Sequence, residues 1–242
     1  MATNRSNAWT RASRSSKQLA GWRSRRVDEA AVAPVPSPPP VLAEPNLVEL
    51  TSGSVLYRVH RRNLEGNGFN PCQGGQTRFA PIRDSRNRCI PSLYAASTVV
   101  ATIHETIFHD IPPNARRKTV PQLVIEETKL SALLVRRTLQ FASLRAPDLM
   151  KWGIQRHSLI DSLPTQYHRT AMWAKAIHEQ FDYVDGLIWT SNRCDPDDAL
   201  LMFGGRVAED DFAVAGVRDG YDASFLNDVR NAGERSGIRI TQ

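Results

Sequence analysis

Five side chains with chemically useful groups are spread along this sequence. They are two guanidinium groups, a carboxylate, an aromatic ring with a hydroxyl and a second hydroxyl, on Arg58, Arg78, Glu105, Tyr94 and Ser191. A guanidinium can hold two oxygens of a phosphate at once, and a carboxylate can stabilise positive charge that develops on a substrate. Each residue also has an ordinary structural role, in a surface ion pair, in the core or at the start of a turn.

Glu105 has the least ordinary surroundings of the five. It lies between Ile103 and Ile107, which continue a four-residue spacing that begins at Val99. This spacing predicts a helix with one apolar face. A buried, ionised carboxylate needs a partner. The structural interpretation is that an arginine neutralises Glu105 in the core, and the functional interpretation is a catalytic carboxylate.

Motifs with a more defined chemistry are incomplete. Gly66-Asn67-Gly68 lacks the third glycine and the following helix of a dinucleotide-binding turn. There is no GxxxxGK[ST] phosphate loop and no GxSxG nucleophile elbow. His104 and His109 are five residues apart, roughly 140° around a helix, so they are not placed to share a metal ion. We therefore expect no metal site.

The elements that must position these residues alternate between strand and helix patterns. Strands are expected at 55–59, 90–95, 122–126, 137–142, 187–191 and 199–203. Helices are expected from Ser97 or Thr98 to about His109, from Pro147 to about Gly153, and over 170–181. The order has no regular βαβα rhythm, which indicates a mixed α/β (α+β) domain.

Residues 1–45 differ in composition from the rest of the chain. They carry seven basic and three acidic residues, whereas the remainder carries 24 and 22. Their last third is rich in proline, which favours extended backbone and removes hydrogen-bond donors. We expect a disordered, basic tail at 1–45 and one folded domain at 46–242.

Composition also limits the classes of function. No apolar run approaches the ~20 residues of a membrane span, and no secretory signal is evident. The three cysteines, Cys72, Cys89 and Cys194, form no CxxC pair, and their odd number gives no closed disulfide framework. This pattern is typical of a reducing compartment and favours the cytoplasm. The nearly balanced charge of residues 46–242 argues against direct nucleic-acid binding by the folded domain.

The five residues lie in segments that together resemble the RES domain, a family named for its Arg, Glu and Ser. The first half of the resemblance consists of Leu56–Val59, Thr77–Phe79, Leu93–Ser97, Ala101 and His104–Glu105. The second half consists of Trp173–Ala174, Asp185–Ser191 and an apolar strand that ends at Phe203. The order and spacing agree over about residues 54–205, and the basic tail is not part of the pattern.

The resemblance implies a compact single domain similar to the ADP-ribosyltransferase fold and a toxin of a bacterial toxin–antitoxin pair. Members use NAD⁺ as a substrate, so no further cofactor is expected. Some cleave the nicotinamide–ribose bond by hydrolysis or phosphorolysis and arrest growth by depleting NAD⁺. Others transfer ADP-ribose to a protein target. The expected partners are therefore NAD⁺, a cognate antitoxin of the Xre-like type and, for a transferase, the modified protein.

Within this resemblance the five residues take specific roles. The carboxylate of Glu105 stabilises positive charge on the ribose as nicotinamide leaves. Arg58 and Arg78 hold the pyrophosphate or fix Glu105. Tyr94 offers its ring to nicotinamide, and Ser191 donates a hydrogen bond to ribose or carboxamide. These assignments make Glu105, Arg58 and Arg78 the catalytic candidates.

Two alternatives belong to other classes of function. A nucleic-acid or membrane-surface module driven by the basic tail would bind in a strongly salt-dependent way and lose binding without residues 1–45. A catalytically inactive interaction protein would fold and bind its partner without consuming NAD⁺. Within the enzymes, the alternative is a mono-ADP-ribosyltransferase, since the sequence does not distinguish water, phosphate and a protein side chain as the acceptor.

Overall fold

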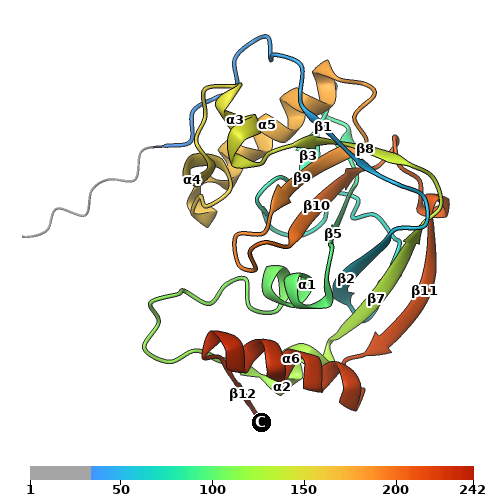
Figure 1. Cartoon of the computed structure of the whole chain (residues 1–242), viewed down its shortest axis with the longest axis vertical. Coiled ribbons are helices and arrows are strands. Elements are labelled where there is room, and N and C mark those ends of the chain that lie inside the picture. Colours follow the sequence, from blue (N-terminus) through green and yellow to red (C-terminus); the bar gives the residue numbers. More distant parts are fainter. Residues whose placement is uncertain (1–33) are drawn as a thin grey trace, which may run out of the picture. The chain divides into compact units, whose positions relative to one another are not determined.

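The computed structural model describes residues 34–242 (Figure 1). The part of the expected tail at 1–33 lies outside the described residues. Residues Pro34–Gln242 form one compact unit. Among the described residues, none of the helices combines the length and apolar character that crossing a bilayer requires.

One mixed sheet of eight strands forms the centre of this unit. Its order is β1-β8-β9-β10-β5-β2-β7-β11, and every neighbouring pair is antiparallel except β8 and β9. The strands are β1 Leu47–Leu50, β2 Val55–Arg61, β5 Ser92–Ala96, β7 Thr128–Val135, β8 Leu139–Ser143, β9 Gly186–Thr190, β10 Asp198–Phe203 and β11 Phe212–Asp219. The expected mixed α/β fold class is confirmed.

The sheet is curled, and its two halves meet where β2 pairs with β5 through a single register pair, Tyr57 and Ala96. Side chains from both ends of the sheet pack into one cluster on the inner face, which includes Leu56, Leu133 and Phe141. The opposite face is covered by helices, with α5 over one half and α1 and α6 over the other (Figure 1). Residues that alternate along a strand therefore face either the inner cluster or the helices.

The helices are short apart from two. They are α1 Val99–Thr106, α2 Gln122–Glu126, α3 Ala146–Met150, α4 Arg156–Leu159, α5 Tyr167–Gln180 and α6 Ala223–Ser236. Two small sheets complete the unit, β3 Ile82–Arg83 with β4 Cys89–Ile90, and β6 Thr119–Pro121 with β12 Arg239–Thr241. In α5, which the sequence predicted at 170–181, Trp173 and Ile177 are buried one turn apart.

One expected element needs correction, and the structure contains others that were not expected. Residues 122–126 were expected to form a strand but form α2, in which only Ile125 is buried while Leu123 and Val124 are exposed. Arg78 and Phe79 lie in a loop before β3. The chain after Phe203 adds β11, α6 and β12, none of which the periodicity predicted.

The proline-rich segment, residues 34–45, packs against the domain. Val35 and Leu42 are 1% and 5% exposed and belong to the same core cluster as Trp173. The indole Nε1 of Trp173 donates to the carbonyl of Pro36 at 2.7 Å. The boundary expected at residue 45 is thus wrong for 34–45, because apolar side chains between the prolines are buried.

Cys72 and Cys89 form a disulfide, with Cα atoms 5.9 Å apart. From the odd number of cysteines we had expected no closed disulfide framework and a reducing compartment. Spacing along the chain did not reveal the pair because the turn between β3 and β4 brings Cys89 back beside Cys72. Cys194 is a free, buried thiol whose pKa burial raises to about 11.

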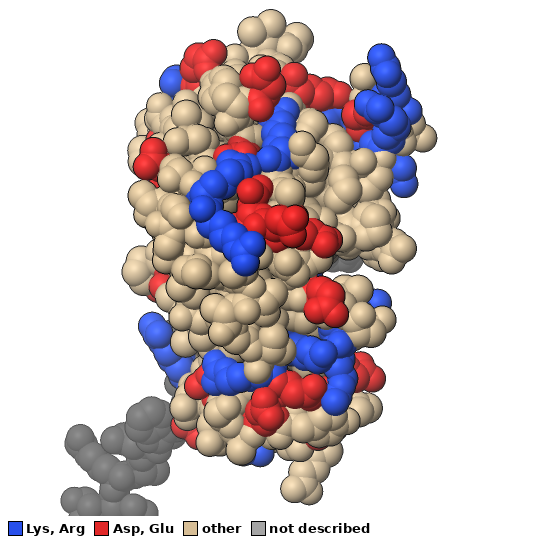
Figure 2. Space-filling model, turned by 90° about the vertical axis from the view of Figure 1, so that its right-hand side faces the viewer, with Lys and Arg blue, Asp and Glu red and all other residues tan. Residues whose placement is uncertain are grey.

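Charged side chains of both signs are intermixed on the face that carries β11 (Figure 2). Two ion pairs on this strand are representative, Arg62 with Asp219 at 2.9 Å and Arg218 with Asp228 at 2.7 Å. Neither positive nor negative side chains form a continuous patch over this face, in agreement with the balanced charge of residues 46–242.

Candidate functional site

Glu105 lies in the last turn of α1 and is half-buried. The helix begins at Thr98, whose hydroxyl accepts a hydrogen bond from the backbone N–H of Ala101, as expected for an N-cap. Oε1 of Glu105 accepts two hydrogen bonds, from Oγ of Ser191 at 2.5 Å and from the backbone N–H of Asn192 at 3.0 Å. Among residues 34–242 no arginine forms an ion pair with this carboxylate. The structural interpretation, in which an arginine neutralises Glu105 in the core, therefore does not describe its contacts.

Ser191 follows β9 directly and is 1% exposed. Its hydroxyl donates to Glu105 and accepts from the backbone N–H groups of Arg193 and Cys194 at 3.1 and 3.0 Å. Arg156 donates to the carbonyls of Thr190 and Ser191. One hydroxyl thus closes the turn after β9 and orients the carboxylate of Glu105.

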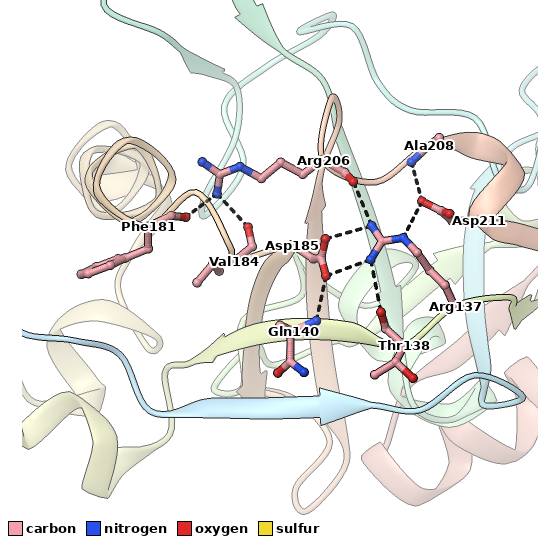
Figure 3. A network of polar contacts seen from close by, with 9 residues as sticks. All are labelled: Arg137, Thr138, Gln140, Phe181, Val184, Asp185, Arg206, Ala208 and Asp211. Carbon is pink, nitrogen blue, oxygen red and sulfur yellow. Dashed lines mark hydrogen bonds and ion pairs between the residues drawn. The ribbon is translucent and has the colours of Figure 1, made fainter.

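The start of β9 is held by an ionic network (Figure 3). Asp185 accepts two bonds from the guanidinium of Arg137, at 2.9 and 3.2 Å, and one from the backbone N–H of Gln140. Arg206 donates to the carbonyls of Phe181 and Val184, both at 2.7 Å, which satisfies acceptors at the end of α5. The network fixes β9 and α5 relative to each other.

Gly186 is required by the close approach of β10. A Cβ atom at this position would lie 2.1 Å from the carbonyl oxygen of Leu201, which is backbone and has no room to move. The glycine therefore allows β9 and β10 to pair in the register that places Ser191 beside α1.

The loop after β9 is also tied to the start of α1. Thr98 donates its hydroxyl hydrogen to Asp197 at 2.7 Å, and the backbone N–H of Asp198 donates to Oγ of Ser97 at 2.9 Å. Because both ends of the Glu105–Ser191 contact are anchored, the carboxylate is preorganised.

Tyr94 lies on the helix-covered face of β5. Its ring packs edge-on against Trp189, with centroids 6.3 Å apart. Its hydroxyl lies 2.9 Å from Oγ1 of Thr77 and accepts from the backbone N–H of Phe79 at 3.0 Å. Burial raises the pKa of this hydroxyl to about 12. Tyr94 therefore holds the loop that carries Arg78.

Arg78 is 6% exposed and projects toward the start of α5. Its Nη1 donates to Oγ of Ser162 at 3.2 Å, and its Cζ lies 5.3 Å from the ring centroid of Tyr167. Among the described residues neither its Nε nor its Nη2 donates a hydrogen bond. Those donors are available to a ligand.

Tyr167 is a site residue that the sequence did not single out. It opens α5, is 4% exposed, and its hydroxyl lies 3.1 Å from Nε2 of His109. Burial raises its pKa, while the charges of Arg78 and Glu105 act on it in opposite directions. Tyr167 thus packs against Arg78 and also senses the charge of Glu105. Its only signal in the sequence is an aromatic residue just before the apolar face of α5.

Arg58 is separated from this group. Leu56 and Arg58 are two residues apart in β2, so both side chains lie on the inner face of the sheet. Val59 lies on the other face, where it packs with Ile103 of α1. Nη1 of Arg58 donates to the carbonyls of Gly66 and Gly68 at 2.9 and 2.7 Å. Burial lowers its pKa to about 10. The structure places Arg58 under the 66–68 loop and does not bring it to Glu105.

Four of the five predicted residues therefore lie around one region, on β5, the loop before β3, α1 and the end of β9. A further donor is close by, since Nε1 of Trp189 is buried without a hydrogen-bond partner among the described residues. The arrangement offers a fixed carboxylate, a partly unsatisfied guanidinium and aromatic rings, which suits a substrate that has an anionic part and a site of developing positive charge.

Comparisons with known proteins show the family of this chain and a structure with a similar fold. The family model of the RES domain matches residues 55–220. No curated protein shows significant similarity to the chain. A solved structure, the M. tuberculosis MbcT–MbcA toxin–antitoxin complex, contains a chain with a TM-score of 0.54 and 14% identity. That alignment covers 75% of this chain and 90% of that chain, and it shows a likeness of fold.

Proposed function

Because this chain belongs to the RES domain family, we propose that it is the toxin of a toxin–antitoxin pair and cleaves the nicotinamide–ribose bond of NAD⁺. An antitoxin partner is supported by the fold that the chain shares with a component of a toxin–antitoxin complex. The site of action in this proposal is the cytoplasm, where NAD⁺ depletion would arrest growth.

The observation that carries this proposal is the fixation of the Glu105 carboxylate. Oε1 is held by Ser191 and by the N–H of Asn192. No protein donor among the described residues contacts Oε2, which therefore remains available to a substrate. A carboxylate with one oxygen anchored and one available can stabilise a cationic ribose without first reorganising.

The reaction needs no redox step. The bond between C1′ of the ribose and N1 of nicotinamide breaks, and its electron pair stays on nitrogen, so nicotinamide leaves as a neutral molecule. Positive charge develops on the ribose next to Glu105. Water or phosphate then adds at C1′ and loses a proton, which gives ADP-ribose or its 1-phosphate.

The substrate would be oriented by the groups around Glu105. Nε and Nη2 of Arg78 would bind the pyrophosphate, because a guanidinium can contact two oxygens together. Tyr167, which packs against Arg78, provides an aromatic wall next to nicotinamide. In this proposal Tyr94 and Ser191 are positioning residues, since their hydroxyls are already bonded to the protein.

The test is to follow labelled NAD⁺ with purified protein, with and without phosphate and cell lysate. Release of nicotinamide with free ADP-ribose supports hydrolysis, and the 1-phosphate supports phosphorolysis. Label on a protein would show the alternative, a mono-ADP-ribosyltransferase. Intact NAD⁺ under all these conditions would contradict enzymatic activity and favour a non-catalytic interaction protein.

Glu105→Gln tests the role of the carboxylate. The amide oxygen can accept from Ser191 and Asn192, but the negative charge is lost. We expect turnover to fall by roughly two to three orders of magnitude, with an unchanged fold and unchanged NAD⁺ affinity. Glu127→Gln is the matched control, since Glu127 is exposed. Equal turnover in the two variants would remove Glu105 from the catalytic residues.

A further inference from the structure

A cavity of about 440 Å³ lies at the small sheet of β6 and β12, away from the residues around Glu105. Its lining is almost entirely basic or hydroxylic and consists of Arg116, Arg117, Lys118, Thr119, Gly237, Arg239 and Thr241. We call this the basic pocket. None of Arg78, Tyr94, Glu105, Tyr167 or Ser191 takes part in it.

Two distant segments of the chain build the basic pocket. β12 pairs in parallel with β6, so that Arg239 lies opposite Thr119, and the backbone N–H of Arg239 donates to the carbonyl of Lys118 at 2.9 Å. Gly237 ends α6 in the left-handed conformation, with φ of 68°, which turns the chain into β12. The pairing brings Arg239 next to the run Arg116–Lys118.

The charges of the basic pocket are not compensated within the described part of the chain. None of its four cations forms an ion pair there, whereas Arg62, Arg137, Arg145 and Arg218 each pair with an aspartate. Four cations that line one cavity repel one another, and this cost is relieved when an anion binds between them.

The lining identifies the chemical class of the ligand. Guanidinium groups bind phosphoryl oxygens in pairs, and threonine hydroxyls can donate to the remaining oxygens. The volume falls in the range of small-molecule sites, about 300–1,000 Å³. We propose that the basic pocket is a binding site for a small anion with two or more linked phosphoryl groups, such as inorganic tripolyphosphate or a nucleoside triphosphate.

This site is distinct from the proposed catalytic site. A second cavity of about 230 Å³, which reaches Asn192 and Arg193, shares only Lys118 with the basic pocket. Gly237, Arg239 and Thr241 also lie beyond residue 220, where the family match ends. The basic pocket therefore depends on the C-terminal part of this chain as well as on the family domain.

The experiment measures binding to the full chain by calorimetry, with inorganic tripolyphosphate, ATP and orthophosphate as separate probes. Arg117→Ser combined with Arg239→Ser removes one cation from each segment. Arg83→Ser combined with Arg86→Ser is the matched control, since both residues are exposed and lie outside the pocket. Circular dichroism checks that both variants are folded, and Arg239→Lys keeps the charge if the double variant does not fold.

We expect tripolyphosphate and ATP to bind the wild-type chain more tightly than orthophosphate, and more weakly as salt is added. The pocket variant should weaken tripolyphosphate binding at least about tenfold, whereas the control variant and the rate of NAD⁺ cleavage should not change. Tighter binding of ATP than of tripolyphosphate would identify the nucleotide as the source of the phosphates. Equal affinities of the two double variants, or binding of duplex DNA without binding of tripolyphosphate, would overturn the proposal.

Discussion

The proline-rich segment provides a quantitative test of how the domain is held together. Leu42 is 5% exposed and packs in the core cluster, whereas its neighbour Val41 is 80% exposed. Leu42→Ala and Val41→Ala therefore remove methyl groups from adjacent positions, one inside the core and one in solvent. The backbone N–H of Leu42 also donates to the side chain of Gln180 at 2.8 Å, and this bond survives in both variants.

The expected difference follows from burial. A Leu→Ala change in a core costs about 2–5 kcal/mol. Leu42 lies in an irregular segment at the edge of the core, where neighbours can relax, so we expect a value near the lower limit, about 2 kcal/mol. For a domain of this size, each kcal/mol lowers Tm by about 2–4 °C. Leu42→Ala should therefore melt about 4–8 °C earlier than wild type, and Val41→Ala within about 2 °C of it.

Two truncations extend the test to the whole segment. Removal of residues 1–33 leaves Val35, Leu42 and the Trp173–Pro36 bond in place. Removal of residues 1–45 deletes these contacts and exposes apolar surface of α5. We expect thermal and urea unfolding to show wild-type stability for the first truncation and a loss larger than that of Leu42→Ala for the second. Equal stability of the two truncated proteins would refute the reasoning.

Three further substitutions test individual side chains. Arg78→Lys loses the planar fork and its packing on Tyr167, so we expect a higher KM for NAD⁺; an unchanged KM would contradict a role in pyrophosphate binding. Arg58→Lys should lower Tm and leave NAD⁺ affinity unchanged, because the lysine would be buried beneath the 66–68 loop. A loss of NAD⁺ affinity without a change in Tm would instead indicate that Arg58 contacts the substrate. Burial, followed by the charge of Arg206, lowers the pKa of His178 to about 4. The folded state thus binds fewer protons than the unfolded state below pH 6.5, and the free energy of unfolding decreases as pH drops from 6.5 toward 4. His178→Phe should reduce this acid sensitivity in unfolding titrations, and an identical pH profile would show that His178 does not contribute to it.

The sequence predicted elements whose pattern is local. The N-cap at Thr98 and the four-residue spacing of Val99, Ile103 and Ile107 located α1 correctly, although the helix ends at Thr106 and not near His109. Short apolar runs located β2, β8, β9 and β10. The run at 122–126 was ambiguous, because three apolar residues fit one helical turn as well as a strand.

Features that depend on distant pairing were not predictable in this way. Arg58 was grouped with Arg78 by residue type, but the alternation of β2 directs it to the other face of the sheet. The disulfide, the burial of Val35 and the position of Tyr167 all arise from contacts between segments far apart in the chain. Glu105 and Ser191 could be placed together only through the resemblance to a family, since they are 86 residues apart.

The register of β11 is irregular, which bears on how the edge of the sheet can associate with other molecules. β11 is an outer strand of the sheet, and most of its central residues are exposed, including Val214 and Val217. Such a strand presents unpaired backbone groups on which a second molecule can add its own strand, a common start of aggregation. The register shift between Val214 and Gly216 interrupts this template. We expect this register shift to hinder strand addition, so that a variant with a regular β11 would aggregate at a lower protein concentration.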